Sequence, residues 1–413
     1  MGTILKNKTL NQAFLLFGST IFGMFFLLGA NFFLTKLISP HSFGDYSFIL
    51  NLFNFLQVIF NFGFFYSINR TLSLADTQEK EREIYGLGIF FVGILALPLG
   101  LCTMIYCRIS LINNPQIYNL ITGLIPFSVI FLFTNFNELI LQGGNRIGQL
   151  AFSRFVPRCL YFLILCGIYF KGKQLGLTTQ SYLFLNIASM AIAYILIIIV
   201  VKPSFLNLKK NLINIFKINK DFGLNVYLGA VVSLGASSLS GILISYFGVS
   251  NLEVGYYAIA LQFTAPLTLI PNVIATSSFK SFTQNKSIDK KLFLITICIA
   301  FCSLIFLFFF SGKIIEIIYG SSYRHAIPLV RLSSFGAVFY GLSDFFNRFL
   351  LANGQGKTLR NASFFVGCTL LICNILFIKL FGGIGASIGY VSAGVCYLII
   401  IVYYYRKFLR SNV

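Results

Sequence analysis

The chain has 413 residues, of which 57% are hydrophobic and only 10% are charged. With a mean hydropathy of +0.85, it has too little polar material to cover a water-soluble globule of this size. This excludes a soluble enzyme and indicates a protein whose apolar runs of about 20 residues cross a bilayer as helices.

The formal net charge is +20, from 31 Lys and Arg against 11 Asp and Glu. In a soluble chain such an excess would favour a nucleic-acid ligand, but in membrane proteins basic residues collect in cytoplasmic loops. The sequence has only two histidines, His41 and His325, and no CxxC pair among its nine cysteines. We therefore expect no metal site, no cofactor and no nucleic-acid partner.

Twelve apolar runs follow one another along the chain, bounded by charged residues or by Gly, Pro and Asn. They fall at about 13–35, 43–67, 84–107, 117–142, 152–170, 180–201, 222–247, 255–279, 291–311, 327–351, 361–380 and 384–405. The first run follows Lys6 and Lys8 and is longer than the apolar part of a signal peptide, so we interpret it as an uncleaved signal anchor. The prediction is an all-α membrane protein with about twelve transmembrane helices.

With twelve spans, the connecting segments alternate between the two sides of the membrane. The side that holds both termini receives 23 Lys and Arg, and the other side receives 8. The 23 include Arg154 and Arg158, which are counted with the connecting segment 143–158. By the positive-inside rule both termini are cytoplasmic. Most of the net charge is thereby explained without an anionic ligand.

The second half of the sequence repeats the first half at an offset of 211 residues. Gly44 corresponds to Gly255 and Gly143 to Gly354, among other sparse matches. Because six spans separate the equivalent positions, the halves have the same orientation and form a parallel repeat. We expect two six-helix lobes, residues 1–201 and 222–413, in an alternating-access transporter.

Residues 202–221 connect the two lobes and combine apolar with basic residues at helical spacing. Phe205, Leu208 and Leu212 recur on one side, whereas Lys209 and Lys210 fall on others. The pattern is typical of a basic amphipathic helix on an anionic inner leaflet. A solvated loop is the alternative.

Charged residues inside the predicted spans are costly and mark candidate functional sites. Asp344 and Arg348 lie four residues apart in the tenth span, so they can pair on one helix face, functionally or as a structural ion pair. Glu138 lies at the same depth in the fourth span, so its contact with Arg348 across the lobes would form a cytoplasmic gate. Arg331 lies near the other end of the tenth span, close to His325, which joins Glu138 and Asp344 as a candidate for gating or coupling. Arg331 is a candidate for the outward half of a cavity, or a residue that simply reaches the interface.

Carboxamide side chains form a second candidate site. Four of them in the second span are spaced by three, three and four residues, which places them on one helix face: Asn51, Asn54, Gln57 and Asn61. Asn31 in the first span and Gln262 in the eighth are further candidates. Such a face is costly in lipid, so we expect it to line a hydrated cavity. Hydrogen bonds between helices are the alternative.

The sequence contains no catalytic motif. The tract GQGKT, from Gly354 to Thr358, resembles the end of a phosphate-binding P-loop. However, Leu351 stands where that motif requires its first glycine, and no strand precedes it. We interpret the tract as a turn between helices and expect no enzyme activity.

Several segments resemble a known family. They are FGDYS and VGYYAIALQF at the start of the second and eighth spans, LQGGNRIGQ and LLANGQGKTLRN after the fourth and tenth, and IYGSSYRHAIPLVRL and GGIGASIGYVSAG near the C-terminus. They are similar to the polysaccharide flippase branch of the multidrug/oligosaccharidyl-lipid/polysaccharide exporter (MOP) superfamily, and the resemblance covers essentially the whole chain. O-antigen-type flippases of that branch are similar to this chain in size and span number.

The resemblance implies a flippase that moves an undecaprenyl-diphosphate-linked oligosaccharide, such as an O-antigen repeat unit of lipopolysaccharide, to the periplasmic leaflet of the bacterial inner membrane. Arg331 and Arg348 would then attract the diphosphate, and the carboxamides of the second span would bind sugar hydroxyls. A proton or sodium gradient, or the membrane potential, is the expected driving force. Membrane lipids, a polysaccharide polymerase and the chain-length machinery are the candidate partners besides the substrate.

The sequence departs from two related families. Peptidoglycan-precursor flippases carry arginines in the first two spans, but residues 13–35 contain none. Cation-coupled drug exporters carry an acid in the early spans of a lobe, whereas here Glu138 is the acid within the membrane interior of the N-terminal lobe. A cation-coupled multidrug exporter and a non-transporting scaffold of the polysaccharide assembly machinery stay as alternatives.

Overall fold

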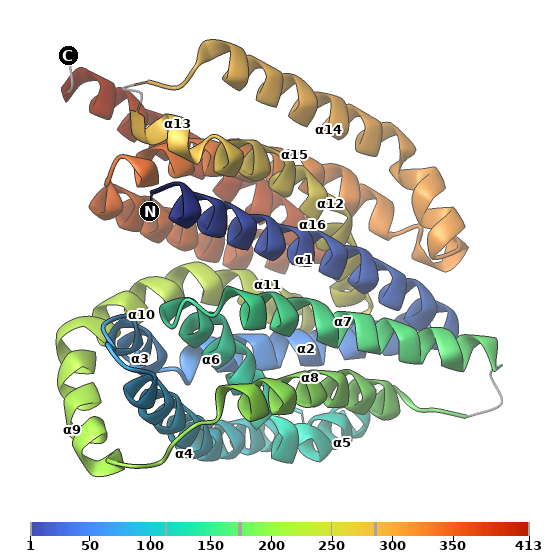
Figure 1. Cartoon of the computed structure of the whole chain (residues 1–413). Coiled ribbons are helices and arrows are strands. Elements are labelled where there is room, and N and C mark those ends of the chain that lie inside the picture. Colours follow the sequence, from blue (N-terminus) through green and yellow to red (C-terminus); the bar gives the residue numbers. More distant parts are fainter. Residues whose placement is uncertain (1, 112–113, 172–175, 249, 285–286, 412–413) are drawn as a thin grey trace. The chain divides into compact units, whose positions relative to one another are not determined.

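The structure is a computed structural model that describes residues 2–111, 114–171, 176–248, 250–284 and 287–411. The secondary structure of these residues is entirely helical (Figure 1). The chain divides into two compact units. The first comprises Met1–Ser39 and Phe53–Ala230, and the second comprises Pro40–Leu52 and Val231–Val413.

Each unit is built from long apolar helices and short connecting ones. The first unit contains α1 (Gly2–Leu37), α3 (Phe64–Ser73), α4 (Gln78–Ser110), α5 (Pro115–Leu124), η1 (Ile125–Phe127), α6 (Val129–Gly143), α7 (Ile147–Phe170), α8 (Thr179–Val201), α9 (Leu208–Ile218), η3 (Asn219–Gly223) and α10 (Leu224–Ala230). The second contains η4 (Val231–Gly235), α11 (Ala236–Phe247), α12 (Leu252–Ser277), α13 (Phe279–Gln284), α14 (Lys290–Ile318), η5 (Ser321–Tyr323), α15 (Ala326–Ala352) and α16 (Gly356–Ser411). Helix α2 (Pro40–Ile59) contributes to both units.

The described helices confirm a multi-pass membrane protein. Eight of them are long and apolar enough to span a bilayer, or ten if each of two bent helix pairs counts as one span. The count of twelve stays a prediction. The two counts differ for two reasons. Residues 222–247 are not counted as a span, and residues 361–405, which are predicted as two spans, are counted as one.

Helix α16 contains two of the predicted spans and is folded back on itself. Gly382 in its middle has a φ of 55° and a ψ of −131°, which is not helical. Beyond this break the backbone of Gly385 lies against the Phe377 carbonyl, and the Thr369 hydroxyl donates a hydrogen bond to the Cys396 sulfur at 3.2 Å. A straight helix of these 56 residues would be about 84 Å long. Because the hydrocarbon core is only about 30 Å thick, the two antiparallel halves fit it as separate spans.

The predicted span 222–247 is a series of shorter helices. Helix α10, the π-helix η4 and helix α11 follow one another without a gap. Residues up to Ala230 group with the first unit, where the Tyr227 hydroxyl donates a hydrogen bond to the Ile59 carbonyl at 2.7 Å. The boundary between the two units therefore falls at the π-helix.

The second predicted span is bent. Helices α2 and α3 meet at an angle of 63°, and Phe62 and Gly63 between them have positive φ angles of 46° and 84°. Asn61 caps the new helix, because its Oδ1 accepts a hydrogen bond from the Phe65 amide at 3.1 Å. Gly63 is required here for a second reason, since a Cβ would lie only 2.6 Å from the backbone of Gly223.

The start of α2 groups with the second unit. Gly44 lies directly against the backbone of Asn251, which also donates a hydrogen bond to Asp45 Oδ1 at 2.8 Å. A Cβ on Gly255 would lie 3.2 Å from the Gly44 Cα. The two glycines that the repeat equates are thus in contact, while the parallel repeat itself stays a prediction.

Candidate functional site

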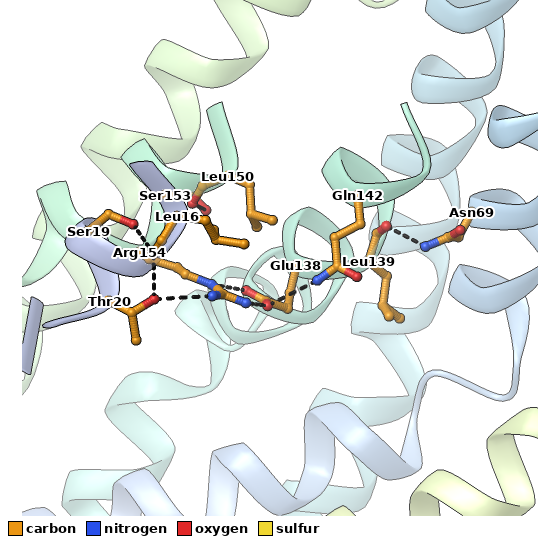
Figure 2. Close-up of polar contacts among 10 residues, drawn as sticks. All are labelled: Leu16, Ser19, Thr20, Asn69, Glu138, Leu139, Gln142, Leu150, Ser153 and Arg154. Atoms are coloured by element: carbon orange, nitrogen blue, oxygen red, sulfur yellow. Dashed lines mark hydrogen bonds and ion pairs between the residues drawn. The ribbon is translucent and has the colours of Figure 1, made fainter. Parts of the chain in front are cut away.

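A cluster of charged side chains lies inside the first unit, where α1, α6 and α7 meet (Figure 2). Arg154 of α7 forms a bidentate ion pair with Glu138 of α6, in which Nε donates to Oε2 at 3.0 Å and Nη2 donates to Oε1. Arg154 also donates to the Thr20 hydroxyl of α1 at 3.3 Å, and Gln142 donates to Glu138 at 3.3 Å. The Arg154 and Glu138 side chains are 27% and 39% exposed. The pair is therefore half-buried within candidate membrane spans.

Arg158 lies one helical turn further along α7, on the same face as Arg154. Arg154, Tyr194 and Glu138 are within its electrostatic reach, but its guanidinium forms no ion pair or hydrogen bond with the described part of the chain. Gly23 of α1 leaves room for it, since a Cβ there would lie 3.0 Å from Nη1 of Arg158. A cation without its own carboxylate is costly in a membrane span, and a bound anion would stabilise it.

The assignment of Arg154 and Arg158 to a connecting segment was wrong. Helix α7 begins at Ile147, so both arginines stand inside a candidate span. The predicted apolar run 152–170 already contained both residues, but because they are charged they were counted with the adjoining connecting segment 143–158. Their spacing of four residues on an otherwise apolar helix was the available signal.

In the second unit, Asn272 of α12 lies between Asp344 and Arg348 of α15. Its Nδ2 donates to Asp344 Oδ2 at 3.4 Å, and its Oδ1 accepts from Arg348 Nε at 3.3 Å. Tyr397 of α16 donates to Asp344 Oδ1 at 3.2 Å and accepts from Asn347 at 2.6 Å. Asp344 and Arg348 thus share Asn272 instead of forming the direct ion pair considered from their spacing.

Asp344 also lines a cavity of about 290 Å³ within the second unit. Hydroxyl groups supply most of the other polar lining: Ser237, Ser240, Tyr257, Tyr390 and Tyr397. One carboxylate among hydroxyls can hold a proton or bind a cation, and the hydroxyls can also bind sugar hydroxyls.

Glu138 and Arg348 each take their partners from their own unit. Glu138 pairs with Arg154, and Arg348 hydrogen-bonds Asn272. The gate between lobes that was expected from these two residues therefore stays a prediction.

The carboxamides of the predicted second span are divided between the units. Asn51 belongs to the second unit, and the other three belong to the first. Gln57 donates to Asn54 at 2.9 Å, and Asn61 donates to Asn135 at 3.3 Å. Asn61 also caps α3, so part of its role is structural. Two further candidates lie half-buried on α1 and α12, Asn31 and Gln262.

Arg331 and His325 lie at the start of α15 and are exposed. Arg331 donates to the Phe308 carbonyl of α14 at 3.1 Å, and its guanidinium lies 5.4 Å from the centre of the Phe308 ring. The His325 ring lies 5.8 Å from that of Tyr256. Neither residue lines the cavity around Asp344. The part of Arg331 in an outward cavity and the part of His325 in gating or coupling stay predictions.

Two comparisons of sequence bear on the family. The model of the polysaccharide biosynthesis protein family matches residues 9–286. An uncharacterized membrane protein of Methanocaldococcus jannaschii is 24% identical to this chain, in a match that covers 88% of this chain and 77% of that protein.

Solved structures share the fold. The lipid II flippase MurJ in an inward closed conformation has a TM-score of 0.74 at 17% identity, over 97% of this chain and 89% of that one. A multidrug resistance transporter of the MATE family, in an inward-facing conformation, has a TM-score of 0.63 at 15% identity, over 94% and 95%. A MOP superfamily transporter from Pyrococcus furiosus has a TM-score of 0.57 at 15% identity, over 96% of both chains. With the family model matching well over half of its residues, the chain belongs to the polysaccharide biosynthesis protein family and has the fold of the MOP superfamily.

Proposed function

We propose that this protein is a flippase for an undecaprenyl-diphosphate-linked oligosaccharide, such as an O-antigen repeat unit. It moves this lipid by alternating access from the cytoplasmic to the periplasmic leaflet of a bacterial inner membrane, with both of its termini in the cytoplasm. Family membership supports a saccharide substrate. The fold supports transport, since its solved neighbours are described as a lipid II flippase and a multidrug resistance transporter.

The substrate class sets a physical problem that a flippase must solve. A sugar-diphosphate headgroup cannot cross hydrocarbon unaided, because each unpaired polar group costs several kcal/mol there. The protein must therefore offer the headgroup cations and hydrogen bonds while the polyprenyl tail stays in lipid.

Arg158 is the residue that carries the proposal. It is a cation in a membrane span, and the nearby Glu138 carboxylate is already held by Arg154. An anionic diphosphate would supply the negative counter-charge for the Arg158 guanidinium. In the same unit, the carboxamides Asn54 and Gln57 can donate hydrogen bonds to the headgroup. In the second unit, Arg348 is a separate candidate cation for an anionic group.

Asp344 is the proposed coupling group. It lines a cavity among hydroxyls and accepts hydrogen bonds from Tyr397 and Asn272. Such a carboxylate can exchange a proton or a sodium ion between the two sides. The membrane potential adds a driving force of about 2.3 kcal/mol per charge per 100 mV when an anion moves outward.

A cation-coupled multidrug exporter is the second candidate, and the same Asp344 cavity favours it. The Pyrococcus furiosus neighbour is described as having a binding pocket of reversed polarity that suggests a different function. The polarity of the pocket is therefore the feature by which a glycolipid flippase and a drug exporter of one fold would differ. Arg158 favours an anionic substrate.

The test is transport in proteoliposomes. A fluorescent undecaprenyl-diphosphate-linked oligosaccharide is placed in one leaflet, and its appearance in the other is followed by dithionite quenching. We expect the wild-type protein to accelerate flipping and Arg158→Gln to lower the initial rate at least tenfold, because the headgroup loses its unpaired cation.

The control is Arg108→Gln, which removes an exposed arginine at the end of α4 and should leave the rate within twofold. Accumulation of a cationic dye without glycolipid flipping would make the protein a drug exporter. If neither activity were found, the remaining hypothesis would be a non-transporting scaffold that binds the polymerase and the chain-length machinery.

A further inference from the structure

A polar pocket of about 490 Å³ lies in the first unit and is lined by residues of α3, α4 and α9 and of the segments next to them, but not by Arg158. Figure 1 shows where these three helices lie. The charged and amide lining is Arg70, Lys80, Glu83, Asn207, Lys210, Asn211 and Asn214. Nothing in the proposed transport uses this pocket.

The entrance of α9 is fixed to α4. The Glu83 carboxylate accepts hydrogen bonds from Asn207 at 2.9 Å and from Asn211 at 3.2 Å. The Ser204 amide donates to the Arg82 carbonyl at 2.9 Å, and the Ser204 carbonyl lies directly against Gly86, where any side chain would collide with it. The pocket wall formed by α9 is therefore held in place.

The other end of α9 is fixed to α3. Asn219 accepts a hydrogen bond from the Ser67 hydroxyl at 3.0 Å and donates to the Phe62 carbonyl at 3.1 Å. The Arg70 guanidinium stacks over the Phe222 ring at 4.5 Å. With both ends of α9 anchored, the pocket is a built feature of the unit and not a gap beside a loose linker.

The charges of the pocket favour an anion. Three cations line it against one carboxylate, and that carboxylate, Glu83, already accepts two amide hydrogen bonds. Lys80 lies 3.9 Å from the exposed Asp76, whereas Arg70 and Lys210 have no ion pair within the described residues. Two cations and the amides of α9 are thus available for phosphate oxygens.

Helix α9 and the residues just before it carry exposed apolar side chains. Ile213 is 66% exposed and Leu206 is 68% exposed, whereas Phe216 is 56% exposed and also packs against the rings of Phe64 and Phe91. Lys209 and Lys217 flank them and are also exposed. Apolar side chains beside lysines are typical of a helix at the boundary of headgroups and acyl chains. This pattern favours a pocket at the level of lipid phosphates.

We propose that this pocket, the α3–α4–α9 pocket, binds the phosphate headgroup of one anionic membrane phospholipid. Arg70 and Lys210 neutralise the phosphate, the amides of α9 donate to it, and the acyl chains lie along the exposed apolar residues of α9. The site is independent of the translocated substrate, so it stands whether or not the flippase proposal does.

The experiment titrates the purified full-length protein with phosphatidylglycerol and counts bound lipid by native mass spectrometry. Phosphatidylcholine is the lipid control. We expect one phosphatidylglycerol to bind at least tenfold more tightly than phosphatidylcholine. Arg70→Gln and Lys210→Gln should each weaken that binding roughly fivefold, the usual effect of one basic residue at an anionic surface.

Lys209→Gln is the matched control, because Lys209 is the preceding residue of the same helix and does not line the pocket. It should change the affinity less than twofold. Equal losses at Lys209 and Lys210 would mean a diffuse charged surface and would overturn the proposal. So would equal binding of the two lipids.

Two further arms separate the possible outcomes. Glu83→Gln keeps a hydrogen-bonding amide beside Asn207 and Asn211 but removes the only carboxylate of the lining, so phosphatidylglycerol should bind roughly fivefold more tightly. This gain cannot come from misfolding. Displacement of the lipid by submillimolar inorganic phosphate would assign the pocket to a soluble phosphate and overturn the lipid assignment.

Discussion

The charged cluster of α6 and α7 shows what residue spacing can and cannot predict. Its members are Glu138, Arg154 and Arg158. The apolar run around Glu138 predicted an intramembrane acid, and spacing placed Asp344 and Arg348 on one helix face. Spacing could not supply their partners, because these come from other helices. Arg154 stands 16 residues from Glu138, and the distance along the chain says nothing about which helices pack together. Polar partners in membranes are set by helix packing, which leaves no periodic signal in the sequence.

The ion pair of Glu138 with Arg154 makes a prediction at this scale. Glu138→Gln leaves two arginines on one face of α7 without a carboxylate, so the free energy of unfolding should fall by about 1–3 kcal/mol. The pair is half-buried, which places the expected loss below that of a fully buried pair. Arg154→Gln with Glu138→Gln should cost less than the sum of the single changes. Thermal unfolding in detergent, followed with a thiol-reactive dye on the nine free cysteines, measures this.

The matched control is the exposed ion pair of Arg324 with Glu316, whose side chains are 63% and 41% exposed. The same double-mutant cycle there should give a coupling of about 0.5 kcal/mol or less. If both pairs coupled equally, the cluster on α7 would be no more than a surface contact.

At the scale of elements, hydropathy placed the long apolar helices well but missed their bends. The predicted span 43–67 is one apolar run, yet α2 and α3 meet at 63°. The bend comes from the positive φ angles of Phe62 and Gly63 and from the close contact of Gly63 with Gly223, which is distant in sequence. In α16, by contrast, the adjacent glycines 382 and 383 marked the break between two predicted spans. A local turn signal can be read from a sequence, whereas a bend that depends on a distant contact cannot.

The prediction at the scale of elements concerns Gly382, at the break in α16. Its φ of 55° with ψ of −131° is a backbone conformation that side chains disfavour, and a Cβ would collide with the Glu253 carboxylate. That carboxylate accepts a hydrogen bond from the Gly383 amide at 2.6 Å, which would be lost as Glu253 moved away. Gly382→Ala should therefore lower the free energy of unfolding by about 2–4 kcal/mol. The same dye-based unfolding assay measures it.

Gly93→Ala is its control, because Gly93 lies within α4 and a methyl group added there would meet no neighbouring side chain or packed helix within 4 Å. The helix should gain up to about 1 kcal/mol. If both variants lost a similar free energy of unfolding, the break in α16 would not require a glycine.

At the scale of the whole molecule, composition predicted the class of protein, and the repeat predicted two halves. The units differ from the predicted lobes because Gly44 at the start of α2 lies against the start of α12, whereas the start of the predicted seventh span packs with α3. Close contacts such as that of Gly44 with Asn251 cause this regrouping. Sparse matches at one offset can equate Gly44 with Gly255, but they cannot tell that the two glycines touch.

The number of membrane crossings is the last prediction. If α16 crosses twice and residues 222–247 also span the bilayer, the chain has twelve spans, and its two termini lie on the same side, as the positive-inside count requires. Alkaline phosphatase fused after Gly383 should then be active, since that position lies outside, and the same enzyme fused after Arg410 should be inactive. A green fluorescent protein fused after Arg410 should be fluorescent for the same reason. An active phosphatase after Arg410 would mean an odd number of crossings. Because the contact of Thr369 with Cys396 places the two antiparallel halves of α16 side by side, the odd number would then have to arise elsewhere in the chain, as it does if residues 222–247 do not span the bilayer.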